Sequence, residues 1–166
     1  MKPIILEWVV SIALIMGVSF SAAAHSSKHD VRAPAGAMIE GVGLAIDASY
    51  DLRLDDLVPG YRVINVVLVN NSFNVIMFNP DKDRWSIRAG KKTYKAIIDL
   101  KSHDPDAWEK IPDRARKMIT YPLAVPIGAR LVLDLFFPDS TPVEKMTELI
   151  VQLATFESTL SIFIRD

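Results

Sequence analysis

The sequence contains no cysteine among its 166 residues. Cysteine thiolates serve as nucleophiles in thiol enzymes and as ligands of iron–sulfur clusters and many zinc sites, and paired cysteines form disulfides. All of these are excluded, and so is a lipid anchor on cysteine. The fold must therefore be held by its apolar core, which is feasible because a domain of this size buries roughly two-thirds of its unfolded surface.

A surplus of charge of one sign is also missing. The chain has 19 Lys and Arg residues against 20 Asp and Glu residues, a formal net charge of −1, and the two signs are mixed along it. Nucleic acids and anionic membranes are recognised by basic fields, so neither is an expected partner. The composition, 50% hydrophobic and 23% charged, is typical of one globular domain.

Catalytic motifs are equally scarce. The sequence has no G-x-S-x-G, P-loop or dinucleotide-binding glycine pattern. His103 lies beside two carboxylates, Asp99 and Asp104, but the sequence offers no nucleophile or orienting group that would converge on it. We interpret His103 as a surface residue at a strand-to-helix junction and expect the protein not to be an enzyme.

The one long apolar run lies at the amino terminus. Lys2 precedes the run from Trp8 to Phe20, and Ser21 to Ala24 (SAAA) provides the small residues of a cleavage site. This order is typical of a secretory signal peptide, so residues 1–24 are predicted to be removed and the protein to be periplasmic or secreted. The alternative is an uncleaved inner-membrane anchor with Glu7 reaching the membrane surface, in which residues 1–24 are the membrane contact.

Strand patterns dominate the rest of the chain. Residues 25–37 are predicted to be a flexible arm, and residues 38–166 one domain. The clearest strand, Tyr61 to Val69, is apolar on both faces, which predicts a central position in a sheet. A type II turn is predicted just before it, with Pro59 and Gly60 at its centre. About seven strands are predicted, a number that favours a β-sandwich. Their residue ranges are 38–46, 61–69, 73–79, 84–88, 93–100, 130–137 and 160–165. Of these, 61–69 with 73–79 and 84–88 with 93–100 are expected to form hairpins.

Two segments follow a helical pattern instead. Asp104 is an N-cap residue followed by proline. Across an insert at 104–120, apolar residues recur at helical spacing: Trp108, Ile111, Ala115, Met118 and Ile119. Pro112 interrupts this pattern, so we expect two short helices or one kinked helix. A late helix is predicted from the capping box at residues 141–144, where Pro142 takes the first helical position. Its apolar stripe would consist of Val143, Met146, Leu149, Ile150 and Leu153.

Two stretches resemble the pattern of bacterial extracytoplasmic immunoglobulin-like domains. Residues 63–72 (VINVVLVNNS) end a strand in Asn-Asn, and residues 125–138 (VPIGARLVLDLFFP) place Pro-x-Gly before a strand that closes in Phe-x-Pro. The resemblance covers about residues 39–137. It implies an immunoglobulin-like β-sandwich with a binding or assembly role and no catalytic residues, and the insert at 104–120 is foreign to the minimal domain of the family.

The insert is the predicted recognition surface. Trp108 is aromatic, a class of side chain that dominates binding hot spots. Arg114, Arg116 and Lys117 fall on the outer side of the helical pattern. We therefore expect a non-enzymatic module, without a cofactor, that binds or assembles with another envelope or secreted protein.

Signal cleavage after Ala24 also suggests an alternative function. It would leave His25 as the first residue, whose α-amine and imidazole can together chelate Cu(II), and a second imidazole from His29 or His103 would complete a three-nitrogen site. This arrangement resembles the histidine brace of periplasmic copper carriers and of copper polysaccharide monooxygenases, both built on immunoglobulin-like sandwiches. The alternative is a periplasmic copper-binding protein that uses His25.

Overall fold

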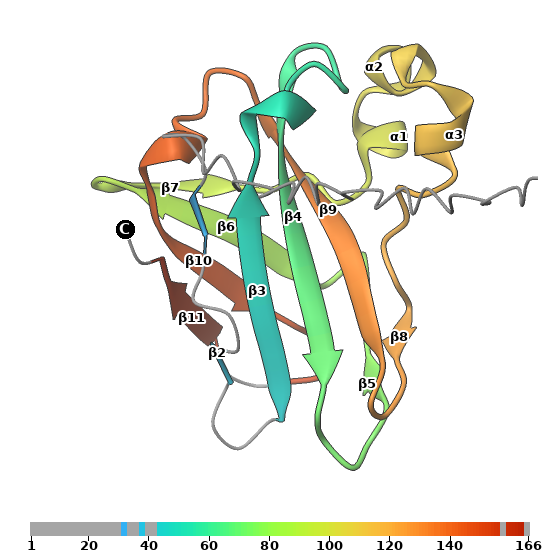
Figure 1. Ribbon diagram of the computed structural model, residues 1–166, viewed down its shortest axis with the longest axis vertical. Helices are drawn as coiled ribbons and strands as arrows, with labels where there is room; N and C mark the ends of the chain where they lie inside the picture. Colours follow the sequence, from blue (N-terminus) through green and yellow to red (C-terminus); the bar gives the residue numbers. More distant parts are fainter. Residues whose placement is uncertain (1–30, 33–36, 39–42, 157–158, 165–166) are drawn as a thin grey trace, which may run out of the picture.

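The computed structural model describes residues 31–32, 37–38, 43–156 and 159–164 (Figure 1). Within these residues most of the regular structure is strand, arranged in antiparallel sheets. The prediction of a mainly β fold is confirmed. The predicted signal peptide and the histidines at positions 25 and 29 lie outside the described residues. Among the described helices, none has the length and hydropathy to cross a bilayer.

The first sheet is built on three long strands: β3 (Leu44–Tyr50), β4 (Tyr61–Asn70) and β9 (Arg130–Pro138). β4 lies between the other two and is antiparallel to both, which confirms the predicted central strand. Two short strands, β1 (Val31–Arg32) and β2 (Ala37–Met38), pair with the free edge of β3.

The second sheet has the order β11-β10-β6-β7. Its members are β6 (Arg84–Ala89), β7 (Lys92–Lys95), β10 (Met146–Gln152) and β11 (Thr159–Phe163). A small third sheet consists of β5 (Ile76–Met77) and β8 (Ala124–Val125). Two 3₁₀ turns complete the connections: η1 (Leu52–Leu54) and η2 (Val143–Lys145).

One buried cluster joins the two larger sheets, which form two layers in Figure 1. Ile46 and Leu68 from the first sheet and Ile87 and Leu149 from the second are all fully buried in it. Trp85, at 2% exposure, is also a core residue. Each such side chain stabilises the fold by about 1.5–3 kcal/mol through burial, so this cluster is the main core.

The chain crosses from the second sheet to the first directly after β7. The amide of Ala96 still donates to the carbonyl of Trp85 in β6 (2.8 Å), but Ile97 exchanges two hydrogen bonds with Phe136 of β9 (2.8 and 3.0 Å). The strand expected at 93–100 therefore ends in the second sheet at Lys95, because its next residues pair with the other sheet.

Three short helices follow this crossing: α1 (Leu100–His103), α2 (Pro105–Lys110) and α3 (Asp113–Arg116). The break at Pro112 between α2 and α3 agrees with the prediction, whereas α1 was not predicted. We call residues 100–119 the helical segment. It packs on a second set of buried side chains, the outer cluster, formed by Val58, Val63, Leu100, Ile111 and Phe136.

The late helix predicted from residue 141 onward is wrong. Its capping box forms only the single turn η2, and residues 146–152 form strand β10 between β6 and β11. The register of β10 against β6 shifts between Met146 and Glu148. This bulge turns Met146 and Leu149 to the same buried face, because an extra residue in a strand resets its alternation. The bulge thus gives Met146 and Leu149 the three-residue spacing that apolar residues have on one face of a helix.

The predicted hairpin between residues 61–69 and 73–79 is also wrong, since β5 pairs with β8. Asn70 explains the difference. Its side chain is fully buried, donates to the carbonyls of Asn74 (2.8 Å) and Val125 (2.9 Å), and accepts from the amide of Ser72 (2.9 Å). These bonds hold the loop after β4 beside Val125.

The predicted type II turn before β4 agrees with the structure. Gly60 has a φ of +84°, and the amide of Tyr61 donates to the carbonyl of Val58 (3.0 Å).

Candidate functional site

The helical segment is fixed to the first sheet by more than its apolar contacts. Asp104 caps α2 by accepting from the amide of Ala107 (3.0 Å), and its other carboxylate oxygen accepts from the Tyr61 hydroxyl on β4 (2.8 Å). The backbone bond from Ala107, followed by the bond from Tyr61, lowers the pKa of Asp104 below its ordinary value. Asp99 caps α1 in the same way through Ser102 (3.0 Å).

The structure separates the four residues predicted to bind a partner. Trp108 is partly buried and packs against the outer cluster. Arg116 donates to Glu109 (2.7 Å) and also pairs with Asp113, so its charge is balanced within the helical segment. Arg114 and Lys117 are exposed. The two exposed residues can reach a partner directly, whereas Trp108 also holds the segment in place.

Sequence reasoning missed one exposed residue of this surface. Met118 was expected in the buried apolar stripe of the insert, but its side chain is 75% exposed. α3 ends at Arg116, and the chain beyond it places Ile119, not Met118, against the outer cluster. Met118 therefore follows Lys117 as an apolar side chain in solvent.

His103 is exposed at the end of α1, as predicted. It borders a shallow depression of about 600 Å³, together with Ser102 and Pro138. Within the part of the chain that the structure describes, no three histidine, aspartate or glutamate side chains are placed to hold a metal ion. The copper site remains a prediction, because His25 and His29 lie outside the described residues.

Native mass spectrometry of untagged protein from the exported fraction tests that prediction. A mass that starts at His25 and carries one copper, with the copper lost in His25→Ala, would support a copper site. A protein that stays metal-free after addition of Cu(II) would contradict it.

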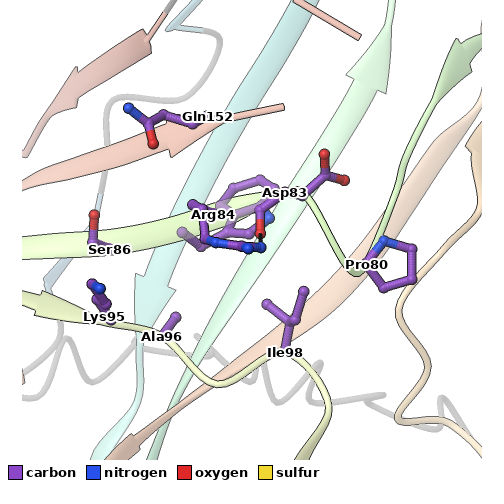
Figure 2. Close-up of a pocket in the computed structure, with 9 residues that line it drawn as sticks. Pro80, Asp83, Arg84, Ser86, Lys95, Ala96, Ile98 and Gln152 are labelled. Atoms are coloured by element: carbon purple, nitrogen blue, oxygen red, sulfur yellow. Dashed lines mark hydrogen bonds between the residues drawn. The ribbon is translucent and has the colours of Figure 1, made fainter. Parts of the chain in front are cut away.

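A second hollow, of about 400 Å³, lies on the outer face of the second sheet (Figure 2). Two pairs of neighbours on adjacent strands supply its polar lining: Arg84 is opposite Gln152, and Ser86 is opposite Lys95. Because alternate residues of a strand share a face, Arg84 and Ser86 point to the same side of β6. Sequence reasoning missed this group, since the pairing of β6 with β10 depended on a segment predicted to be helical.

The carboxylate of Asp83 borders this hollow but turns away from it, as Figure 2 shows. It is 1% exposed and accepts from the amides of Asn79 (2.7 Å) and Ala154 (2.7 Å) and from the Tyr121 hydroxyl (2.8 Å). Burial raises the pKa of Tyr121, so this hydroxyl keeps its proton for the bond. Asp83 therefore joins three loops and makes no ion pair with the cationic side chains of the hollow.

Comparisons with protein-family models, with curated proteins and with solved structures find no match to this chain.

Proposed function

We propose that this protein is an exported, non-enzymatic binding or assembly module with an immunoglobulin-like fold, and that the helical segment recognises another envelope or secreted protein. The strand order supports the fold. β3-β4-β9 corresponds to strands A-B-E of an immunoglobulin domain, and β11-β10-β6-β7 to strands G-F-C-C′. Ile97, which bridges to the outer edge of β9, takes the edge position of strand D.

The observation that carries the binding role is the contrast between the two sides of the helical segment. Its inner side is anchored by the outer cluster and by the bond from Tyr61 to Asp104. Its outer side presents Arg114, Lys117 and Met118 to solvent. A surface held rigid before binding loses little conformational entropy on association. Basic and apolar side chains on a rigid support therefore suit recognition of a partner with an acidic rim and an apolar contact.

Site-specific photo-cross-linking in cells that export the full chain tests this function. A cross-linker replacing Met118 should give one discrete adduct with a partner. The same cross-linker at Lys91, an exposed residue of the β6–β7 turn, should give none. Reversing both charges, Arg114→Glu with Lys117→Glu, should remove the adduct without lowering Tm, because exposed side chains contribute little to stability.

Three results would contradict the proposal. They are no adduct from position 118, the same adducts from positions 118 and 91, and an adduct that survives both charge reversals. Trp108→Ala is unsuitable as the test, because Trp108 packs on the outer cluster and its loss would lower stability and binding together.

A further inference from the structure

The hollow on the outer face of the second sheet combines cationic, polar and apolar side chains, none of which belongs to the proposed protein-binding surface. We propose that it binds a small, hydroxylated anion, a sugar-like molecule that carries a carboxylate or phosphate group. Its volume of about 400 Å³ falls within the range of roughly 300–1,000 Å³ common for small-molecule sites. This function is independent of the helical segment, which packs on the other sheet.

Arg84 is the first element of the anion site. Its Nη1 donates to the carbonyls of Asp81 (2.8 Å) and Asp83 (2.7 Å), which fix the guanidinium in one orientation. Its Nε and Nη2 have no partner among the described residues, and no described carboxylate pairs with it. A planar guanidinium held in this way keeps N–H donors for an oxyanion, and guanidinium–oxyanion bonds are among the stronger hydrogen bonds in proteins.

Lys95 adds a second positive charge at the same hollow, again without an ion pair to a described residue. It lies opposite Ser86 on the neighbouring strand, and Ser86 lies two positions from Arg84 on β6. Directly opposed side chains in an antiparallel pair have Cβ atoms about 4.5–5.5 Å apart. Ser86 is thus a neighbour of both cations, and its hydroxyl can donate to the same oxyanion.

The remainder of the hollow indicates what the anion is attached to. Gln152 donates its amide to Thr159 (2.8 Å), which leaves its carbonyl oxygen to accept from a ligand hydroxyl. Pro80 and Ile98 form an apolar wall on the side of the hollow away from Ser86 (Figure 2). An oxyanion attached to a ring with hydroxyls and an apolar face would satisfy all of these groups, whereas an inorganic ion would contact only the cations.

Isothermal titration calorimetry on the exported protein tests this site with four probes: glucose 6-phosphate, glucuronate, glucose and inorganic phosphate. At least one of the anionic sugars should bind more than about tenfold tighter than glucose and tighter than inorganic phosphate, because a charge-assisted hydrogen bond contributes about that factor. The better of the two sugars identifies the oxyanion as phosphate or carboxylate.

Variants locate the binding. Arg84→Met and Lys95→Met should each lower the affinity for the tighter-binding anionic sugar by roughly tenfold. Arg88→Met is the matched control, because Arg88 shares the outer face of β6 but already pairs with Glu148 (3.1 Å). The Lys95 side chain makes no hydrogen bond or ion pair to described residues, so Lys95→Met keeps the test valid even if Arg84→Met fails to fold.

The proposal is overturned if neither anionic sugar binds more tightly than glucose, or if both the Arg84→Met and Lys95→Met proteins bind as the unsubstituted protein does. Equal affinity for inorganic phosphate and glucose 6-phosphate, without binding of glucuronate, would also overturn it, because the hollow would then recognise no sugar body.

Discussion

The outer faces of the two larger sheets are used in different ways. On the first sheet, Val63 and Phe136 point outward and are nevertheless buried, because the helical segment lies over them. On the second sheet, the outward residues Arg84 and Gln152 are exposed. The covered face holds the proposed recognition surface in position, whereas the open face leaves polar side chains available to a ligand.

The same contrast occurs within a single strand. Phe136 and Val132 both lie on the outer face of β9, four residues apart, yet Phe136 is fully buried and Val132 is 53% exposed. The helical segment therefore covers only one end of the first sheet. The burial of an outward residue depends on the segment above it and not on its own hydrophobicity.

The largest expected effect comes from removing a covered side chain. Phe136→Ala should lower the free energy of unfolding by about 3–5 kcal/mol, because it leaves a cavity under the helical segment. Val132→Ala, on the same face of the same strand, should cost far less since its side chain is already half in solvent. Urea denaturation of both proteins measures the difference. Similar losses for the two would contradict the structural role of the helical segment.

A smaller effect on stability is expected from Asp104, which caps α2 and accepts a hydrogen bond from Tyr61 of β4. The pKa of Asp104 in the folded protein lies below the ordinary value of 3.8. Its charged form thus stabilises the fold at pH values above 3.8, and this contribution is lost as the pH falls through the lowered pKa. Asp104→Asn preserves an N-cap acceptor but cannot titrate.

Thermal unfolding between neutral pH and about pH 3 checks this direction of the pH dependence of stability. The unsubstituted protein should lose more stability on acidification than Asp104→Asn, and Asp106→Asn, an exposed neighbour in α2, should behave as the unsubstituted protein. An identical acid response for Asp104→Asn would contradict the assignment.

The smallest expected effect is on the open face. Lys95→Met should change the free energy of unfolding by no more than about 0.5 kcal/mol, because an exposed side chain without hydrogen-bond partners contributes little to stability. Equilibrium unfolding in urea measures this at neutral pH. A large loss from Lys95→Met would show that this face is part of the packing and would weaken the contrast between the two sheets.

Local sequence patterns predicted much of the fold, and they failed where pairing decided the structure. β4 was recognisable because its residues are apolar on both faces, and the break at Pro112 followed from the chemistry of proline. β10 was missed because its bulge spaces Met146 and Leu149 as a helix would. A central strand is stabilised by two neighbours, and such tertiary pairing overrides a local capping box.

The candidate sites depended on the same pairing. The exposure of Arg114 and Lys117 was predictable from helical periodicity, whereas the burial of Trp108 required the outer cluster. The polar group around Arg84 could not be found from sequence, because Gln152 reaches it from β10, which is far along the chain and was predicted to be helical. Lys95 lies on the neighbouring strand of the predicted hairpin, but it does not define the group without Gln152. Ligand groups assembled across strands leave no spacing pattern in the sequence.

The two sheets are proposed to differ in what occupies their outer faces: a small anion binds the open face of the second sheet, and the helical segment covers one end of the first sheet. A titration followed by ¹H–¹⁵N NMR, with glucose 6-phosphate and glucuronate added separately to the purified protein, tests both outer faces in one experiment. The account predicts saturable shifts centred on Arg84, Ser86, Lys95 and Gln152, with α2, α3 and Phe136 unaffected. Shifts centred on α2 and α3, or none from either sugar, would contradict it.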